Sequence, residues 1–261
     1  MPAELSPIDK AKFLAAKRAT DFVEDGMKLG LGTGSTAAWM VRCLGERIRE
    51  EGLRVVGVPT SRRTAELARQ VGVPISTLDE VKWLDLTIDG ADEFDGNLNL
   101  IKGGGAALLQ EKIVATASDQ MIVIADAAKD VTQLGAFPLP IEVIPFGWQT
   151  TKALVEETLV SLDVLNRDVT LRMNGAAPLV TDESNYILDL HLRRIGNPRQ
   201  LALVLNQIPG VVENGLFIDI CDIVVIGHGD GRVTVRDINS GEEHDDRVEF
   251  APNDNVFADL D

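Results

Sequence analysis

The stretch Met27-Lys28-Leu29-Gly30-Leu31-Gly32-Thr33-Gly34-Ser35-Thr36 decides the fold. Its first half reads as a short strand, and a helix is predicted from Ala37 to about Glu50. Glycines between a strand and a helix, followed by hydroxyl residues, present backbone N–H groups and the positive end of the helix dipole. The segment therefore predicts an anion site, most naturally for phosphate. A plain strand-to-helix turn with Ser35 or Thr36 as its cap is the alternative.

Two nucleotide-binding patterns do not fit this loop. A dinucleotide fingerprint, G-x-G-x-x-G, requires glycine where Ser35 stands. A P-loop requires G-x-x-x-x-G-K-[ST], which the stretch also lacks. The loop therefore favours a small phosphate compound over a nucleotide.

Strand-like and helix-like segments alternate on both sides of this loop. Such alternation predicts parallel β-α-β units, and the fold class is α/β, with a doubly wound (Rossmann-like), mostly parallel sheet. The predicted strands are 27–31, 53–58, 84–88 and 121–125, and the predicted helices are 8–23, 37–50, 61–71 and 106–117.

The pattern changes after Phe137-Pro138-Leu139-Pro140. A β-α-β-β-α-β rhythm follows, which predicts a smaller α+β (ferredoxin-like) domain with an antiparallel sheet. The predicted division is 1–138 with 213–261 for the Rossmann-like domain and 139–212 for the small domain. Residues 236–261 are an acidic, weakly periodic extension, expected to be mobile or loosely docked.

Composition limits the partners. The net charge of −16 argues against nucleic acid and against an anionic membrane. Basic residues comprise 16 Arg and 9 Lys, and both salt adaptation and ordinary solubility explain the acidic excess. The N-terminal residues lack signal-peptide features, no apolar run approaches the roughly 20 residues of a membrane helix, and a cytoplasmic protein is expected. Two distant cysteines predict buried thiols, and three histidines without ligand-like spacing argue against a His-based metal site.

Acidic side chains crowd behind the strand at 84–88, at Asp89, Asp92, Glu93 and Asp95. The carboxyl ends of parallel strands line the ligand crevice of such a sheet. Crowded carboxylates suit proton transfer, because like charges and burial raise the pKa of some of them. A divalent metal site and a solvated acidic turn are the alternatives, although the spacing does not match a calcium loop.

Lys102-Gly103-Gly104-Gly105 is more informative. Three successive glycines cost backbone entropy, and close approach of a ligand to the main chain is one reason to keep them. The following helix is predicted to place Glu111 two turns in. Taken alone, Glu111 reads as an inert surface residue, since lone exposed charges usually are, and Lys129 is either a second phosphate cation or a surface lysine.

Together these segments resemble the A-type ribose-5-phosphate isomerase family over nearly the whole chain, from about Lys12 to Arg236. Each motif alone is weak, but their order and spacing are specific. The matching motifs are Gly32-Thr33-Gly34-Ser35-Thr36, Asp89-Gly90-Ala91-Asp92-Glu93, Lys102 to Leu108 with Glu111-Lys112, Ala125 to Lys129, and Phe137 to Pro140 running to Ile144-Pro145, with Val58 to Thr64 as a variant of a Ser/Thr-rich segment.

The resemblance implies an aldose–ketose isomerase that interconverts D-ribose 5-phosphate and D-ribulose 5-phosphate in the non-oxidative pentose phosphate pathway. It places the catalytic base on Glu111. Ring opening is assigned to Asp89 with Asp92, and enediolate stabilisation to Lys102 with the glycine amides, although Lys102 contacting phosphate is the alternative. The phosphate anchor is Gly34, Ser35 and Thr36 with Lys129, joined by Lys12. The implied substrate-binding residues are Thr33, Gly34, Ser35, Thr36, Asp89, Gly90, Ala91, Asp92, Lys102, Gly103, Gly104, Gly105 and Lys129.

The resemblance further implies no cofactor, no metal, and a homodimer or homotetramer. Three other functions remain open. A related sugar-phosphate or CoA-handling enzyme is disfavoured by the Lys102 to Glu111 block. A non-catalytic sugar-phosphate sensor has no need for Glu111, and Ser35 disfavours a nicotinamide-dependent oxidoreductase.

Overall fold

The computed structural model describes residues 5–249 and divides them into two compact units. The first unit contains residues 5–90, 113–129 and 220–249, and the second contains 91–112 and 130–219. The chain thus leaves the first unit between Gly90 and Ala91, inside the acidic motif. No helix of the described residues is long and apolar enough to cross a membrane.

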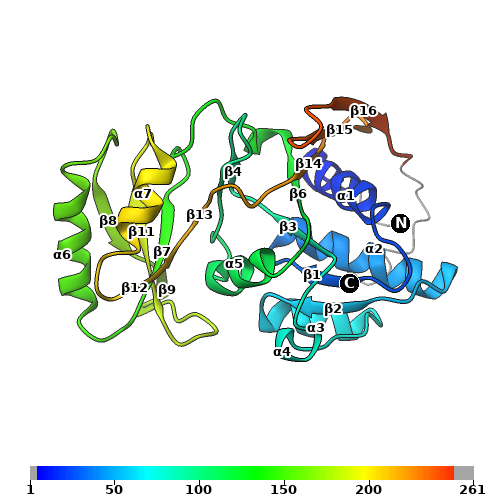
Figure 1. Ribbon diagram of the computed structural model, residues 1–261, viewed down its shortest axis with the longest axis horizontal. Coiled ribbons are helices and arrows are strands. Elements are labelled where there is room, and N and C mark those ends of the chain that lie inside the picture. The colour runs from blue at the N-terminus through cyan, green and yellow to red at the C-terminus, as the bar shows by residue number, and fades with distance from the viewer. Residues whose placement is uncertain (1–4, 250–261) are drawn as a thin grey trace. The chain divides into compact units, whose positions relative to one another are not determined.

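A seven-stranded sheet forms the centre of the first unit (Figure 1). Its order, β2-β1-β3-β6-β14, is parallel throughout, and the antiparallel strands β15 and β16 extend one edge. The strands are β1 (Lys28–Leu31), β2 (Val56–Pro59), β3 (Leu86–Gly90), β6 (Met121–Asp126), β14 (Ile223–Gly227), β15 (Arg232–Asp237) and β16 (Glu243–Arg247). Because the chain moves outward in opposite directions from β1, the topological switch point lies between β1 and β3.

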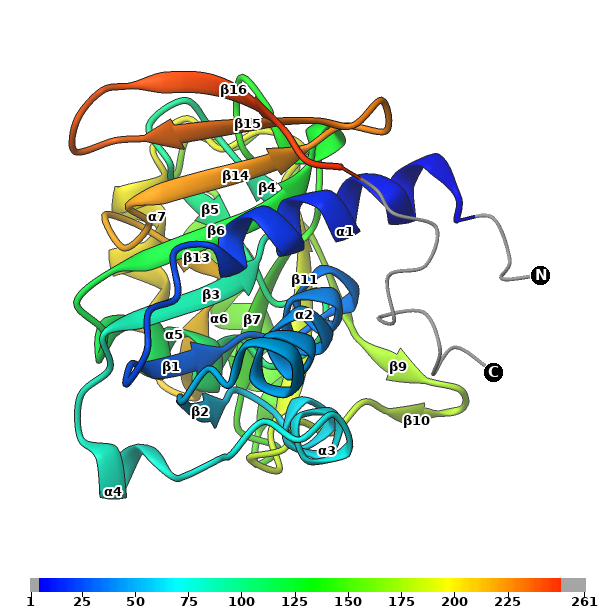
Figure 2. The same cartoon turned by 90° about the vertical axis from the view of Figure 1, so that its right-hand side faces the viewer.

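Helices α1 (Pro7–Thr20) and α2 (Ser35–Glu51) lie on one face of this sheet, where they contact each other (Figure 2). The Ser6 side chain caps α1 by accepting from Asp9 N–H, and the apolar side of the helix is buried at Phe13, Ala16 and Ala19. The other helical segments of the first unit are α3 (Arg62–Gln70), α4 (Leu78–Val81) and the 3₁₀ turn η1 (Ala127–Lys129).

The second unit contains a four-stranded antiparallel sheet of order β12-β7-β11-β8. Side chains alternate along each strand, so Leu139, Ile141 and Val143 of β7 pack under the helices while Pro140 and Glu142 lie on the opposite face. The elements follow the β-α-β-β-α-β order, namely β7 (Leu139–Val143), α6 (Trp148–Leu159), β8 (Asp168–Leu171), β11 (Tyr186–His191), α7 (Pro198–Leu205) and β12 (Val211–Asn214).

Smaller elements complete the second unit. A three-stranded sheet has the order β13-β5-β4, and a hairpin of two short strands follows β8. Helix α5 (Leu108–Thr116) begins in the second unit and ends in the first. The short strands are β4 (Glu93–Phe94), β5 (Leu100–Ile101), β9 (Met173–Asn174), β10 (Ala177–Pro178) and β13 (Leu216–Phe217).

The compact units differ from the predicted domain boundaries. Residues 91–112, 130–138 and 213–219 were expected with the Rossmann-like domain, but they belong to the second unit. The physical reason is that β4 pairs with β5 and β5 pairs with β13, and Ile101 and Leu216 share the second unit's apolar core.

The start of the acidic extension forms regular structure, which the sequence pattern did not predict. Residues 236–247 belong to a hairpin in which Arg236 pairs with Glu243 and Arg232 with Arg247 in register. Asp246 accepts a hydrogen bond from Arg18 of α1 at 2.8 Å, which ties the outer strand to the helix. Residues 250–261 lie outside the described part of the chain. The cysteines Cys43 and Cys221 are buried thiols, as predicted.

Candidate active site

The glycine-rich loop joins β1 to α2 at the switch point of the first unit's sheet. Gly34 is the N-cap of the 17-residue helix α2 and has φ +113° and ψ 176°, a conformation essentially confined to glycine. The N–H groups of the first helical turn point at the space before the helix, and no N-cap side chain accepts hydrogen bonds from them. The positive end of the helix dipole points the same way, as an anion site requires.

Gly32 lets β3 approach this loop closely. A Cβ atom on Gly32 would lie 2.1 Å from Asp89 Oδ1 and 2.5 Å from Asp89 Cα. In its absence, the fully buried Asp89 carboxylate accepts hydrogen bonds from Thr33 N–H at 3.0 Å and Gly90 N–H at 2.7 Å. Asp89 therefore fixes the loop that precedes α2.

A cluster of buried hydroxyl groups supports the loop from the other side. Thr33 Oγ1 lies 2.8 Å from Thr60 Oγ1 and from Ser61 Oγ, and 3.1 Å from Thr64 Oγ1. Thr64 in turn donates to the carbonyl of Gly32 at 3.0 Å. Thr33 supports the loop through these contacts, and its role in binding substrate stays a prediction. The sequence motifs included Thr60, Ser61 and Thr64 but assigned them no role.

Two lysines accompany the loop. Lys12 of α1 donates to Ser35 Oγ at 3.1 Å, so an ammonium lies beside the first turn of α2. Lys129 ends η1, directly behind the carboxyl end of β6. Since β6, β3 and β1 are neighbours in the sheet, the loop, Asp89 and Lys129 all follow the same edge.

The glycine triplet of the second unit is held by its own set of contacts. Gly104 N–H donates to Asp92 Oδ2 at 2.7 Å, and a Cβ atom on Gly104 would lie 2.5 Å from Asp92 Oδ1. Lys102 N–H donates to the carbonyl of Gly215 at 2.9 Å. Gly103 has φ +106° and lies close to Leu108 and Pro140. Gly103 and Gly104 are therefore required by close approach of the main chain to its neighbours.

Lys102 and Glu111 form a buried ion pair. Lys102 Nζ lies 3.3 Å from Glu111 Oε1, and their side chains are only 2% and 4% exposed. Helix α5 begins at Leu108, so Glu111 lies in its first turn and not two turns in as predicted. The reason is that residues 103–106 form a turn, with Ala106 at φ +60° and its N–H bonded to the Gly103 carbonyl. The helix dipole there favours a negative charge.

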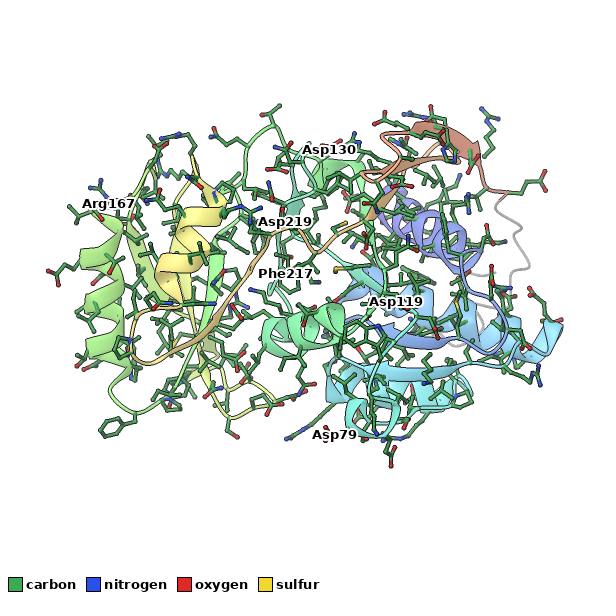
Figure 3. The ribbon with its side chains drawn as sticks, viewed as in Figure 1. Asp79, Asp119, Asp130, Arg167, Phe217 and Asp219 are labelled. Carbon is green, nitrogen blue, oxygen red and sulfur yellow. The ribbon has the colours of Figure 1, made fainter. Side chains whose placement is uncertain are left out.

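The side chain of Phe217 of β13, labelled in Figure 3, lies near this pair and near a second ion pair. The Nζ atoms of Lys102 and Lys112 lie 5.4 Å and 4.9 Å from the centre of its ring. Lys112 is ion-paired with Glu213 at 2.8 Å. Burial lowers the pKa of Lys112 despite this partner. Burial opposes ionisation of Glu213 too, but Lys112, Asn206 and the Asn214 N–H hold its pKa below the usual value.

The crowded carboxylates of the acidic motif separate into different roles. Glu93 accepts hydrogen bonds from the N–H groups of Gly135 and Phe137, and Asp95 accepts from those of Asn97 and Asn99. Both therefore hold turns of the second unit. Within residues 5–249, no three His, Cys, Asp or Glu side chains are grouped in a way that suits a metal ion.

Each unit contains some of the predicted site residues. The first unit holds Thr33, Gly34, Ser35, Thr36, Asp89, Gly90 and Lys129. The second unit holds Ala91, Asp92, Lys102, Gly103, Gly104, Gly105 and Glu111.

An anion loop in one unit and a buried lysine–glutamate pair in the other are features of an enzyme that acts on a phosphorylated substrate. Comparison with known proteins identifies the family. The profile of ribose 5-phosphate isomerase A (phosphoriboisomerase A) matches residues 56–231. A ribose-5-phosphate isomerase A from Ruegeria sp. (strain TM1040) is 77% identical over 260 residues, or 100% of this chain and 99% of the relative. The one from Ruegeria pomeroyi is 75% identical with the same coverage.

Solved structures give the same result. A D-ribose-5-phosphate isomerase in complex with phospho-erythronic acid has a TM-score of 0.82 and 44% identity, covering 88% of this chain and 99% of that one. Ribose 5-phosphate isomerase A from Methanocaldococcus jannaschii has a TM-score of 0.80 and 41% identity, covering 87% and 98%. The chain belongs to the ribose 5-phosphate isomerase A family. The predicted family, enzyme class and α/β fold class are thereby confirmed.

Proposed function

We propose that this chain interconverts D-ribose 5-phosphate and D-ribulose 5-phosphate through an enediolate, with Glu111 as the base that carries the proton. The isomerisation itself is the activity of the family. The proton transfer between C2 and C1 requires a base, a stabilised oxyanion, a phosphate anchor and a group that opens the furanose ring. The observation that carries the proposal is the buried pair of Lys102 and Glu111 beside the glycine triplet.

Glu111 takes the proton from C2 and returns it to C1. A positioned carboxylate supplies roughly 10²–10⁴-fold in rate as a general acid–base. Its burial excludes water that would exchange or misdirect the proton, and Lys102 supplies the counter-charge at 3.3 Å. A carboxylate so enclosed acts on its substrate and not on solvent.

Lys102 and the amides of Gly103 to Gly105 stabilise the enediolate. Negative charge develops on the substrate oxygens as the proton leaves carbon, and donors already in place there add on the order of 10²–10³-fold. Phospho-erythronic acid, bound in the solved relative, carries a carboxylate next to its hydroxyl-bearing carbons. A phosphorylated acid of this shape resembles the charged intermediate, which supports the assignment.

The phosphate anchor is the start of α2 at Gly34, Ser35 and Thr36, with Lys12 and Lys129 as its cations. Lys12 already contacts Ser35, and the N-terminus of a 17-residue helix suits a phosphate. Ring opening falls to Asp89, assisted by Asp92. Both carboxylates accept backbone N–H groups, which hold them in one orientation.

A coupled assay for ribulose 5-phosphate formed from ribose 5-phosphate tests the proposal, with and without a chelator. We expect turnover that survives chelation, because no step requires a metal. Loss of turnover on chelation, restored by a divalent cation, would contradict the cofactor-free mechanism.

We further propose that the enzyme acts in the non-oxidative pentose phosphate pathway of the cytoplasm, as a homodimer or homotetramer. Light scattering of the purified protein distinguishes these assemblies from a monomer of 28.3 kDa.

A further inference from the structure

Arg172 lies just beyond β8, where its side chain meets Asp189 of β11. Arg172 N–H donates to the carbonyl of Ile187 at 2.9 Å, and Thr170 is in register with Asp189. Arg172 and Asp189 are therefore diagonal neighbours on one face of the antiparallel pair. Arg172 Nε donates to Asp189 Oδ2 at 2.9 Å and Nη2 donates to Oδ1, so the contact is bidentate. The two side chains are only 15% and 16% exposed.

The remaining guanidinium nitrogen holds the glycine triplet. Arg172 Nη1 donates to the carbonyl of Gly103 at 2.8 Å and to that of Gly104 at 3.1 Å. The face of the sheet that carries Arg172 also carries Pro140, which is in register with Asp189 and lies close to Gly103. The triplet is thus attached to the sheet through a pair of side chains more than sixty residues away in sequence.

These two hydrogen bonds determine where the amide groups point. In a planar trans peptide the C=O and N–H bonds are antiparallel. The Gly103 carbonyl faces Arg172, and accordingly the N–H of Gly104 faces away, toward Asp92 Oδ2 at 2.7 Å. The Gly104 carbonyl also faces Arg172, so the N–H of Gly105 in the same peptide group points away from the guanidinium. Without such an anchor, three glycines would sample many orientations.

We infer that Arg172, held by Asp189, is a positioning residue for the isomerisation: it orients the Gly105 amide as a hydrogen-bond donor to the enediolate oxygen. The inference rests on the proposed function, in which the glycine amides stabilise the enediolate. A donor of this kind is worth on the order of 10²–10³-fold in kcat when it is lost outright. A misoriented amide loses part of this rate contribution. We therefore expect kcat to fall while the substrate still binds through its phosphate.

The test compares Arg172→Lys, Arg172→Ala and Asp189→Asn with the wild-type enzyme. The matched control is Arg194→Ala, which breaks the exposed Arg194–Asp163 pair of the same unit. For each variant we would measure kcat and KM for ribose 5-phosphate, and the inhibition constants of phospho-erythronic acid and inorganic phosphate. Circular dichroism melting shows which variants are folded, and the comparison uses those.

We expect Arg172→Lys to lower kcat by about 10- to 100-fold with KM changed by less than about 3-fold. Binding of phospho-erythronic acid should weaken with kcat, inorganic phosphate should bind as before, and guanidinium ions should restore part of kcat in Arg172→Ala. Asp189→Asn should lower kcat and weaken phospho-erythronic acid binding by smaller factors. Arg194→Ala should leave both unchanged.

The inference is overturned if Arg172→Lys keeps kcat within about 2-fold of wild type, or if kcat falls while phospho-erythronic acid binds unchanged. Failure of the proposed function looks different, because Glu111→Gln would then retain turnover whatever the Arg172 variants do.

Discussion

Lys102 Nζ lies 3.3 Å from Glu111 Oε1, and both side chains are almost completely buried. A buried ion pair is weak evidence for stability, since removing two charges from water costs much of what their attraction returns. A pair kept there beside a glycine triplet is better explained by chemistry.

Lys12→Met removes the ammonium beside Ser35. If that lysine binds the phosphate, KM for ribose 5-phosphate should rise by about 10-fold, or about 1.4 kcal/mol, with kcat changed little. Steady-state kinetics measure both constants. Lys10→Met on the same helix is the matched control and should leave KM unchanged. An equal rise in the two variants would show a general charge effect instead of an anchor.

Gly32→Ala introduces a Cβ atom 2.1 Å from Asp89 Oδ1. The Asp89 backbone is at 2.5 Å from the same position, so the strand must shift and the Thr33 contact is strained. We expect a loss of about 1–3 kcal/mol in the free energy of unfolding, measured in urea, together with a lower kcat. Gly96→Ala, where a Cβ meets open space, should change neither. Wild-type stability and activity in Gly32→Ala would refute the packing argument.

Lys112→Met leaves the partly buried Glu213 carboxylate without its ammonium partner. Such one-sided removal typically costs about 3 kcal/mol of the free energy of unfolding. Lys152→Met breaks a more exposed pair with Glu156, at 2.5 Å, and should cost less than about 1 kcal/mol. Urea unfolding compares the two. Similar losses would mean that burial does not set the strength of the Lys112 contact.

The carboxyl of Glu142 makes the free energy of unfolding depend on pH. Burial raises the pKa of this carboxyl above its usual value, against the hydrogen bonds from Asn185 and Thr181. The folded protein then binds the proton more tightly than the unfolded chain, so stability falls as pH rises from the usual pKa through the raised one. Below about pH 4, Glu142→Gln and the wild type should have similar free energies of unfolding. Above the raised pKa of Glu142, the variant should be the more stable of the two. Parallel pH profiles of the unfolding free energy would contradict this.

The strands that could be predicted from the sequence are those that are deeply buried. Strands β3 and β6 are covered on both faces, so they appear in the sequence as apolar runs between helices. Strand β16, Glu243-His244-Asp245-Asp246-Arg247, was not predicted. It is an exposed edge strand with no apolar alternation, and its order depends on pairing with β15 and on contacts such as Arg18 with Asp246.

The candidate site was predictable to the extent that it lies in contiguous motifs. The glycine loop, Asp89, the glycine triplet and Glu111 each carry a local signal in residue type and spacing. Arg172 and Asp189 carry none, because their contact with Gly103 depends on the register of β8 with β11. Phe217 likewise meets Lys102 only through the pairing of β13 with β5.

The most direct test of the central claim is the kcat of Glu111→Gln for ribulose 5-phosphate formation, with phospho-erythronic acid binding as the check that the site is intact. The amide keeps the shape of the carboxylate but cannot take a proton. We predict a fall in kcat of at least about 10²-fold with the inhibitor still bound. A variant that binds the inhibitor and retains more than about a tenth of the wild-type kcat would contradict the assignment of Glu111 as the base.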